Sequence, residues 1–136
     1  MAFLLDTNVL SELRKGLKCD AKVRAWAVSS RHAQHWISVL SLGEVRKGIE
    51  LLRKKSPSQC PAFESWLIQL ETTYDGCILT VTDAIADEWG RLQAKQTMPV
   101  VDSLIAATAL VHKLTIVTRN TNDFAPSGAN LLNPFL

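Results

Sequence analysis

The sequence predicts an α/β protein in which helices cover both faces of a mostly parallel sheet. Short apolar segments alternate along the chain with longer segments whose apolar residues recur at helical spacing. The short segments are apolar throughout, which is typical of strands that are buried on both faces. A chain of 136 residues without a repeat or a linker is expected to form one domain over residues 1–136.

The first strand and the first helix are expected at the N-terminus. FLL, at residues 3–5, is a short apolar run, and Asn8 is placed to cap the helix VLSELRK, which ends at Gly16. Asp6 lies in the turn between the two elements. Because carboxylates are rarely buried without a partner, Asp6 either caps a helix or serves chemistry.

The later elements follow from apolar spacing and from the Gly, Pro and polar residues that interrupt it. The expected strands are residues 35–39, 77–81, 114–118 and 130–132. The expected helices are residues 20–30, 41–55, 61–74, 82–95 and 100–113. Together these elements predict an α/β sandwich.

Charge and cysteine content exclude several classes of protein. Fifteen basic and 13 acidic residues leave a formal charge of +2, too small to indicate nucleic-acid binding through bulk electrostatics. The basic run at residues 46–55 could meet phosphates, although a solvated helix face is the commoner explanation. Three widely spaced cysteines predict neither a disulfide framework nor a zinc site. With no segment near the ~20 apolar residues of a membrane span, the expected location is the cytoplasm.

Four carboxylates occupy positions that a solvated surface does not explain. Asp6 and Asp123 follow strands, whereas Glu44 and Asp102 are expected in the first turns of helices. In an open α/β sheet, ligands bind beyond the carboxyl ends of the strands. If these helices begin at that edge, the four carboxylates meet in one pocket.

Such a pocket requires a cation, because close carboxylates raise one another's pKa. Oxygen ligands suit Mg²⁺ or Mn²⁺, which usually binds one or two carboxylates together with a substrate phosphate. The reaction implied is metal-assisted hydrolysis of a phosphodiester bond.

Each carboxylate also has a structural explanation. Glu44 with Ser41 fits a capping box, Asp102 could complement a helix dipole, and Asp123 could hold an Asx-turn. Asp6 is harder to explain in this way, because Asn8 is the better-placed cap and could instead orient Asp6.

Two hydroxyl residues, Thr118 and Ser103, could support the pocket by holding a carboxylate or a water. Ser and Thr at the ends of elements are nevertheless caps more often than site residues.

Four segments, LLDTNVL, SLGEVRKGI, VVDSLIAATAL and TIVTRNTNDF, together resemble the PIN-domain nucleases, specifically the VapC and FitB-like toxins of bacterial toxin-antitoxin modules. The resemblance runs nearly end to end. It implies one PIN domain with a three-layer α/β/α sandwich, a mostly parallel sheet of four or five strands, and a Mg²⁺- or Mn²⁺-dependent endoribonuclease site.

By matching motif, the resemblance assigns the catalytic and metal-binding roles to four residues. Asp6 and Asp102 would be the principal metal ligands, with Glu44 and Asp123 binding the metal directly or through water. Asn8 and Thr118 would support them.

The resemblance also implies a homodimer, an RNA substrate and a cognate antitoxin, which would make the only contact with DNA. No membrane association is expected. Arg119 could hold a substrate phosphate, or it could be a surface arginine. A groove for an antitoxin helix could form between two apolar stripes, although both could pack on the sheet instead. The stripes are Leu42/Val45/Ile49/Leu52 and Phe63/Trp66/Leu67/Leu70.

Three other functions compete with the nuclease. A receiver domain needs a further Asp and a late Lys that the strand ends do not offer, and a dehalogenase-like phosphatase needs Asp-x-Asp where Asn8 stands. A non-catalytic RNA-binding or scaffold module of the same fold remains the alternative, but it would gain nothing from clustered carboxylates.

Overall fold

A five-stranded sheet forms the centre of the protein, and the computed structural model describes all of residues 1–136. The strand order is β3-β2-β1-β4-β5, and every neighbouring pair is parallel. The strands are β1 (Ala2–Leu5), β2 (Gln34–Ser38), β3 (Ile78–Leu79), β4 (Thr115–Val117) and β5 (Leu131–Leu132). The predicted parallel sheet is confirmed.

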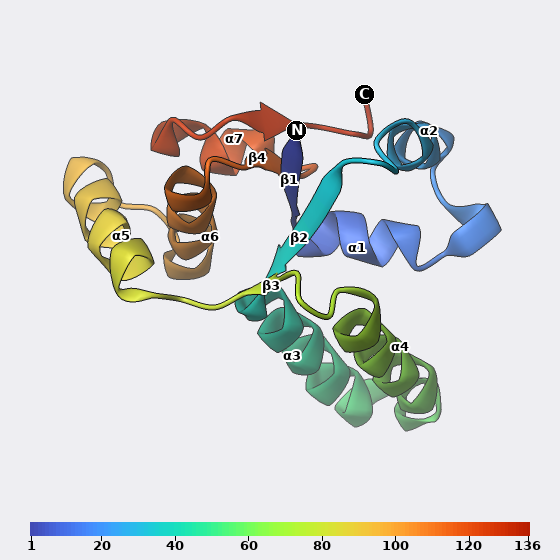
Figure 1. Cartoon of the computed structure of the whole chain (residues 1–136). Helices are drawn as coiled ribbons and strands as arrows, with labels where there is room; N and C mark the ends of the chain where they lie inside the picture. Colours follow the sequence, from blue (N-terminus) through green and yellow to red (C-terminus); the bar gives the residue numbers. More distant parts are fainter.

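The sheet lies between two apolar cores. Successive side chains of a strand point to opposite faces, so Phe3 and Leu5 of β1 join one buried cluster and Leu4 joins the other. The first cluster packs under α1 (Thr7–Leu13), α2 (Ala21–Ser29), α3 (Val39–Lys55) and α4 (Cys60–Thr73). The second packs under α5 (Asp83–Lys95), α6 (Val100–His112) and α7 (Thr121–Phe124). Figure 1 shows these helices on the two sides of the strands, which is the expected three-layer arrangement.

Helix α3 begins earlier than its sequence pattern predicts. Ser38, the last residue of β2, caps the helix by accepting a hydrogen bond from the backbone amide of Leu40 at 3.0 Å. Ser41 therefore lies inside the helix, where its buried hydroxyl has no hydrogen-bond partner. The short helix α7 was not expected, because four residues are too few to show helical periodicity.

The two apolar stripes are divided between the core and a cavity that they line together. Val45, Ile49 and Leu52 of the first stripe and Phe63 and Trp66 of the second line one cavity of about 290 Å³. Val45, Ile49, Leu67 and Leu70 are all buried in the first core, so the alternative that the stripes pack on the sheet holds for these residues. None of the helices has both the length and the apolar character needed to cross a membrane.

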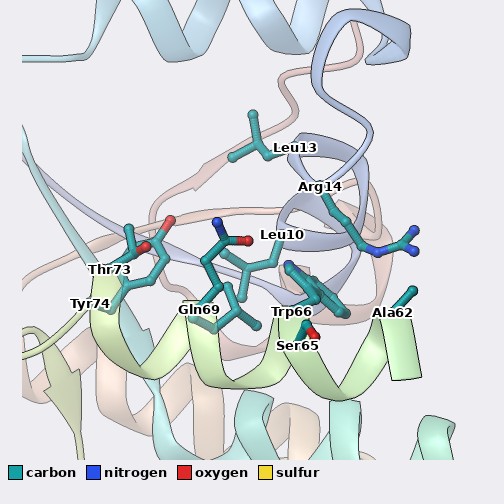
Figure 2. Close-up of a pocket in the computed structure, with 10 residues that line it drawn as sticks. Leu10, Leu13, Arg14, Ala62, Ser65, Trp66, Gln69, Thr73 and Tyr74 are labelled. Carbon is teal, nitrogen blue, oxygen red and sulfur yellow. The ribbon is translucent and has the colours of Figure 1, made fainter. Parts of the chain in front are cut away.

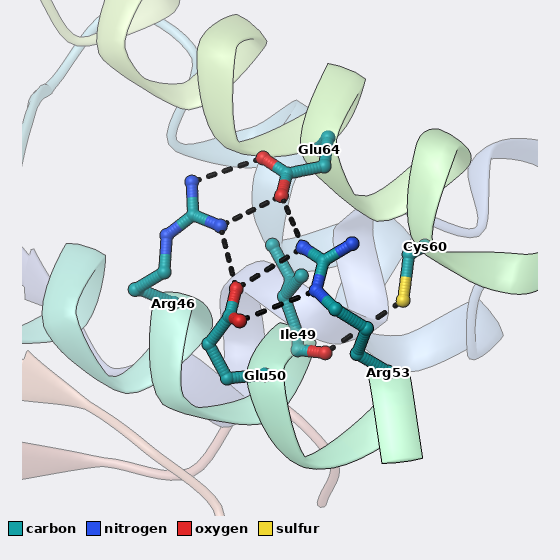
Figure 3. A network of polar contacts seen from close by, with 6 residues as sticks. All are labelled: Arg46, Ile49, Glu50, Arg53, Cys60 and Glu64. Carbon is teal, nitrogen blue, oxygen red and sulfur yellow. Dashed lines mark hydrogen bonds and ion pairs between the residues drawn. The ribbon is translucent and has the colours of Figure 1, made fainter. Parts of the chain in front are cut away.

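Ion pairs on the outer surface hold α3 and α4 together. Glu64 of α4 accepts hydrogen bonds from Arg46 at 2.7 and 2.9 Å and from Arg53 at 2.9 Å, and both arginines also bond to Glu50 (Figure 3). Two of the basic side chains in the run at residues 46–55 are therefore neutralised within the protein. This leaves the lysines of that run as its unpaired cations.

Candidate active site

The candidate site lies at the carboxyl end of the two central strands. Leu5 of β1 and Val117 of β4 are in register, and the backbone amide of Asp6 donates to the Val117 carbonyl at 3.0 Å. The chain therefore places Asp6 and Thr118 side by side, directly after the two strands. The strand order reverses between β1 and β4, which is where open α/β sheets bind ligands.

Asp6 both caps a helix and belongs to a polar network. Its Oδ1 accepts from the backbone amide of Thr7 at 2.9 Å, so Asp6 and not Asn8 is the N-cap of α1, and the capping prediction for Asn8 was wrong. Its Oδ2 accepts from the Thr118 hydroxyl at 2.9 Å and from the Asn8 amide at 3.4 Å. Asn8 also donates to Thr118 and accepts from the Arg119 backbone amide. The carboxylate is thus fixed in orientation.

Burial makes the charge of Asp6 unfavourable. Only 7% of the Asp6 surface is exposed to solvent, and this burial raises the pKa of its carboxyl group above the ordinary value. The hydrogen bonds from Thr118 and Thr7 oppose the rise, whereas the negative charge of Asp123 adds to it. A buried carboxylate with this balance is typical of a functional site.

Glu44 reaches the same site from α3. Because the helix begins at Val39, Glu44 does not lie in its first turn, and the capping box with Ser41 does not form. Instead, Oε1 of Glu44 accepts from the Thr7 hydroxyl at 2.8 Å, a contact that no sequence pattern indicated. Partial burial raises the pKa of Glu44, the Thr7 hydrogen bond lowers it, and the charges of Asp6 and Asp102 raise it again.

Asp102 and Asp123 complete the cluster. Asp102 lies in the first turn of α6, as predicted, and Asp123 lies in α7. Burial raises the pKa of Asp102, and the charges of Asp6 and Asp123 raise it further. The charges of Asp6 and Asp102 therefore act on Glu44, and the charge of Asp123 acts on Asp6 and Asp102. None of the four forms an ion pair.

The donor atoms of these four side chains suit a hard cation. No three acidic, histidine or cysteine side chains converge closely enough to bind a single ion. Carboxylate oxygens nevertheless are the ligands that Mg²⁺ and Mn²⁺ prefer, and Mg²⁺ usually keeps several waters. A cation held by one or two of these carboxylates and reached by the others through water fits the arrangement.

Comparison with known proteins decides the family. The sequence model of the PIN-domain family matches residues 3–125 of the chain. The chain belongs to the PIN-domain family.

Two relatives and one solved structure are similar to this PIN domain over nearly its whole length. It is 30% identical to the toxin FitB of Neisseria gonorrhoeae, over 97% of both chains. It is 28% identical to the VapC ribonuclease Y4jK of Sinorhizobium fredii, over 97% of this chain and 96% of that one. The crystal structure of FitAcB from Neisseria gonorrhoeae superposes with a TM-score of 0.85 at 28% identity, covering 98% of each chain.

The Ser103 hydroxyl, a possible support for the pocket, makes its hydrogen bonds elsewhere in this PIN domain. Its hydroxyl donates to the Val100 carbonyl at 2.8 Å and accepts from Trp89 and Gln93 at 2.9 and 2.8 Å. These contacts join α5 to α6 in the second core. Ser103 is therefore a packing residue beside Asp102.

Two cations lie near the site, and the sequence indicated only one of them. The Arg119 guanidinium stacks on the Phe135 ring, with Cζ 3.8 Å from the ring centroid, which leaves the N–H groups at its edge free to donate. Lys47 lies one turn after Glu44 on α3, and its charge lowers the pKa of Glu44. In the sequence, Lys47 is one of several cations in the basic run, and no pattern distinguishes it from its neighbours.

Replacing Thr118 with valine is expected to impair both stability and the site. The Thr118 hydroxyl is fully buried, holds Asp6 and accepts from the backbone amide of Asn120 at 3.0 Å. Losing these contacts should cost about 1–3 kcal/mol of unfolding free energy and about 10–100-fold in activity. Thr108→Val is the matched control, because Thr108 is equally buried and bonds only within its own helix. Equal losses of RNA cleavage in both variants would contradict a role for Thr118 in the site.

Proposed function

We propose that this PIN domain is a divalent-metal-dependent endoribonuclease that acts as the toxin of a toxin-antitoxin module. The observation that carries the proposal is a set of four carboxylates without ion pairs, the buried Asp6 and three others near it, whose charges disfavour one another when no cation is bound. The relatives named as a toxin and as a ribonuclease support the same reaction class, at about 30% identity.

Asp6 and Asp102 would be the principal ligands of Mg²⁺ or Mn²⁺, and Glu44 and Asp123 would bind it directly or through water. When bound, such a cation lowers the pKa of water and stabilises charge on the phosphate. The chain itself fixes the orientation of the ligands. Thr118 holds Oδ2 of Asp6, and the Thr7 hydroxyl holds Oε1 of Glu44.

An antitoxin would dock in the groove between α1 and α4. The groove has a volume of about 560 Å³, and Figure 2 shows Leu10 and Leu13 of α1 opposite Trp66 of α4, with Arg14 at the rim. Apolar residues on both walls suit one face of an amphipathic helix. Trp66 and Leu70 of the second apolar stripe line this groove, whereas the first stripe does not reach it.

Other assembly partners follow from the same proposal. A homodimer would use the apolar surface around Val39, Leu51 and Val101, which are exposed and line one shallow hollow between α3 and α6. DNA would be contacted only through the antitoxin. An RNA substrate and unpaired cysteines suit the cytoplasm.

The test is cleavage of a long structured RNA by purified, partner-free protein with Mg²⁺, with Mn²⁺ and with EDTA. We expect fragments with either metal and none with EDTA. Stable RNA binding without cleavage under all three conditions would favour the alternative, a non-catalytic RNA-binding or scaffold module. Phosphorylation by acetyl phosphate would instead indicate a receiver-like function.

A further inference from the structure

A second cavity adjoins the acidic site. It lies between α1, α3 and α4, has a volume of about 290 Å³, and we call it the three-helix cavity. Thr7 and Glu44, the hydrogen-bonded pair described above, line it together with Ser11 of α1. From Glu44 it follows α3 as far as Leu52, a length of about 12 Å at the helical rise per residue. The cavity is therefore continuous with the candidate active site.

The walls of the three-helix cavity are apolar and partly aromatic. Phe63 and Trp66 of α4 line it with their rings 6.2 Å apart and inclined at 74°. The Arg14 guanidinium lies 3.9 Å from the Phe63 centroid, so a cation already occupies one face of that ring. Val45 and Ile49 of α3 contribute the aliphatic wall. The cavity thus has polar side chains at one end and aromatic and aliphatic side chains along the rest of its wall.

A glycine keeps the α3 side of the cavity open. Gly48 lies in the interior of the 17-residue helix α3, where glycine is less favourable than alanine. A Cβ atom built on Gly48 would meet no atom within 4 Å, so packing within the chain does not require a glycine there. The bare backbone leaves room for a group from outside the protein, and Gly48 also lines the neighbouring hollow between α3 and α6.

We propose that the three-helix cavity binds one unpaired nucleobase of the RNA, next to the phosphate that is cleaved. This proposal rests on the nuclease function proposed above, of which it names a specificity site. A volume of about 290 Å³ lies at the lower end of ligand pockets, so it suits a single base and not a complete nucleotide. Unpaired bases are commonly bound by stacking on aromatic side chains.

The polar end of the cavity favours a nucleobase over an aliphatic side chain from a protein partner. Thr7, Ser11 and Glu44 all line the cavity, and the Thr7 hydroxyl donates to Oε1 of Glu44. A base presents an aromatic face to the apolar walls and a hydrogen-bonding edge to the Ser11 hydroxyl and Oε2 of Glu44, the polar atoms that this pair leaves over. An aliphatic side chain would cover those two atoms without pairing them, which is unfavourable.

The test combines substitutions that fill the three-helix cavity with RNA substrates that lack one base. Gly48→Leu and the smaller Gly48→Ala are compared with wild type on a single-stranded RNA in which one abasic position is moved along the strand. Cleavage (kcat/KM) is measured for each protein, and RNA affinity is measured in the Asp6→Asn background. For wild type, one abasic position beside the cut should lower kcat/KM about tenfold, the effect of losing one stacked base. Gly48→Leu should cleave intact RNA about tenfold less well and should show no further loss at that position, with Gly48→Ala in between.

Gly90→Leu is the matched control, because Gly90 also lies in a helix interior with no atom near its Cβ, on α5 at the other face of the sheet. It should cleave like wild type. An unchanged dependence on the same abasic position in Gly48→Leu would overturn the base-binding proposal and leave the nuclease intact. If wild type binds RNA without cleaving it and Gly48→Leu loses the base-dependent part of the affinity, the cavity binds a base but the nuclease proposal fails. Absence of both cleavage and base-dependent binding would overturn both.

Discussion

Replacing Asp6 by asparagine is expected to lower metal-dependent RNA cleavage by more than about a hundredfold. Removing a residue that merely supports a metal ligand typically costs 10–100-fold, and Asp6 would be a ligand itself. Asparagine keeps one oxygen, which can accept from the Thr7 backbone amide, so the cap of α1 should survive, while its Nδ2 would face the Thr118 hydroxyl as a donor in place of the acceptor Oδ2. The measurement is kcat/KM on one RNA at saturating Mg²⁺ and at saturating Mn²⁺.

The control for this prediction is Asp75→Asn. Asp75 is exposed in a turn, and its carboxylate makes no hydrogen bond. Asp75→Asn should retain wild-type cleavage. The Asp6→Asn protein should melt at the same temperature as wild type or higher in EDTA, because an unfavourable buried charge has been removed. Residual cleavage within tenfold of wild type in a folded Asp6→Asn protein would show that Asp6 is not a metal ligand.

The melting temperature of the wild type is expected to rise by several degrees with Mg²⁺ or Mn²⁺. A ligand that binds only the folded chain stabilises it by about 2.7 kcal/mol at a concentration 100 times its Kd. Asp102→Asn should melt a few degrees higher than wild type in EDTA and should respond much less to the metal. Both effects follow from removing one of the mutually repelling charges.

The same repulsion predicts how the difference between the two proteins depends on pH. Burial and neighbouring charges raise the pKa of Asp102, so the folded chain binds its proton more tightly than the unfolded chain does. The contribution of Asp102 to the unfolding free energy therefore falls as the pH rises from 3.8, the ordinary pKa of the group, through its raised pKa in the folded chain. Above the raised pKa, the full destabilisation by the Asp102 charge is present. The advantage of Asp102→Asn should be present at neutral pH and should disappear near and below pH 3.8. An advantage that is independent of pH, or identical metal responses in the two proteins, would contradict the cluster.

The alternation of apolar segments was enough to predict the parallel sheet and most of its helices, because burial on two faces leaves a strong signal in each segment. The boundaries were less certain. Val39 reads as the end of a strand by its apolar character, but the Ser38 side chain caps the helix and moves its start. A hydrogen bond from one side chain to the backbone decides this, and hydrophobic periodicity does not record it.

Asp6, Glu44, Asp102 and Asp123 stand out in the sequence as the acidic side chains to explain, because their positions at the ends of elements do not fit a solvated surface. The groups that surround them follow from the packing of distant segments and could not be predicted. Thr118 contacts Asp6 across 112 positions and Thr7 contacts Glu44 across 37. Ser103, the immediate neighbour of Asp102, turns away into the core. The physical reason is that a helix directs adjacent residues to different faces, while parallel pairing of β1 with β4 joins residues from opposite ends of the chain.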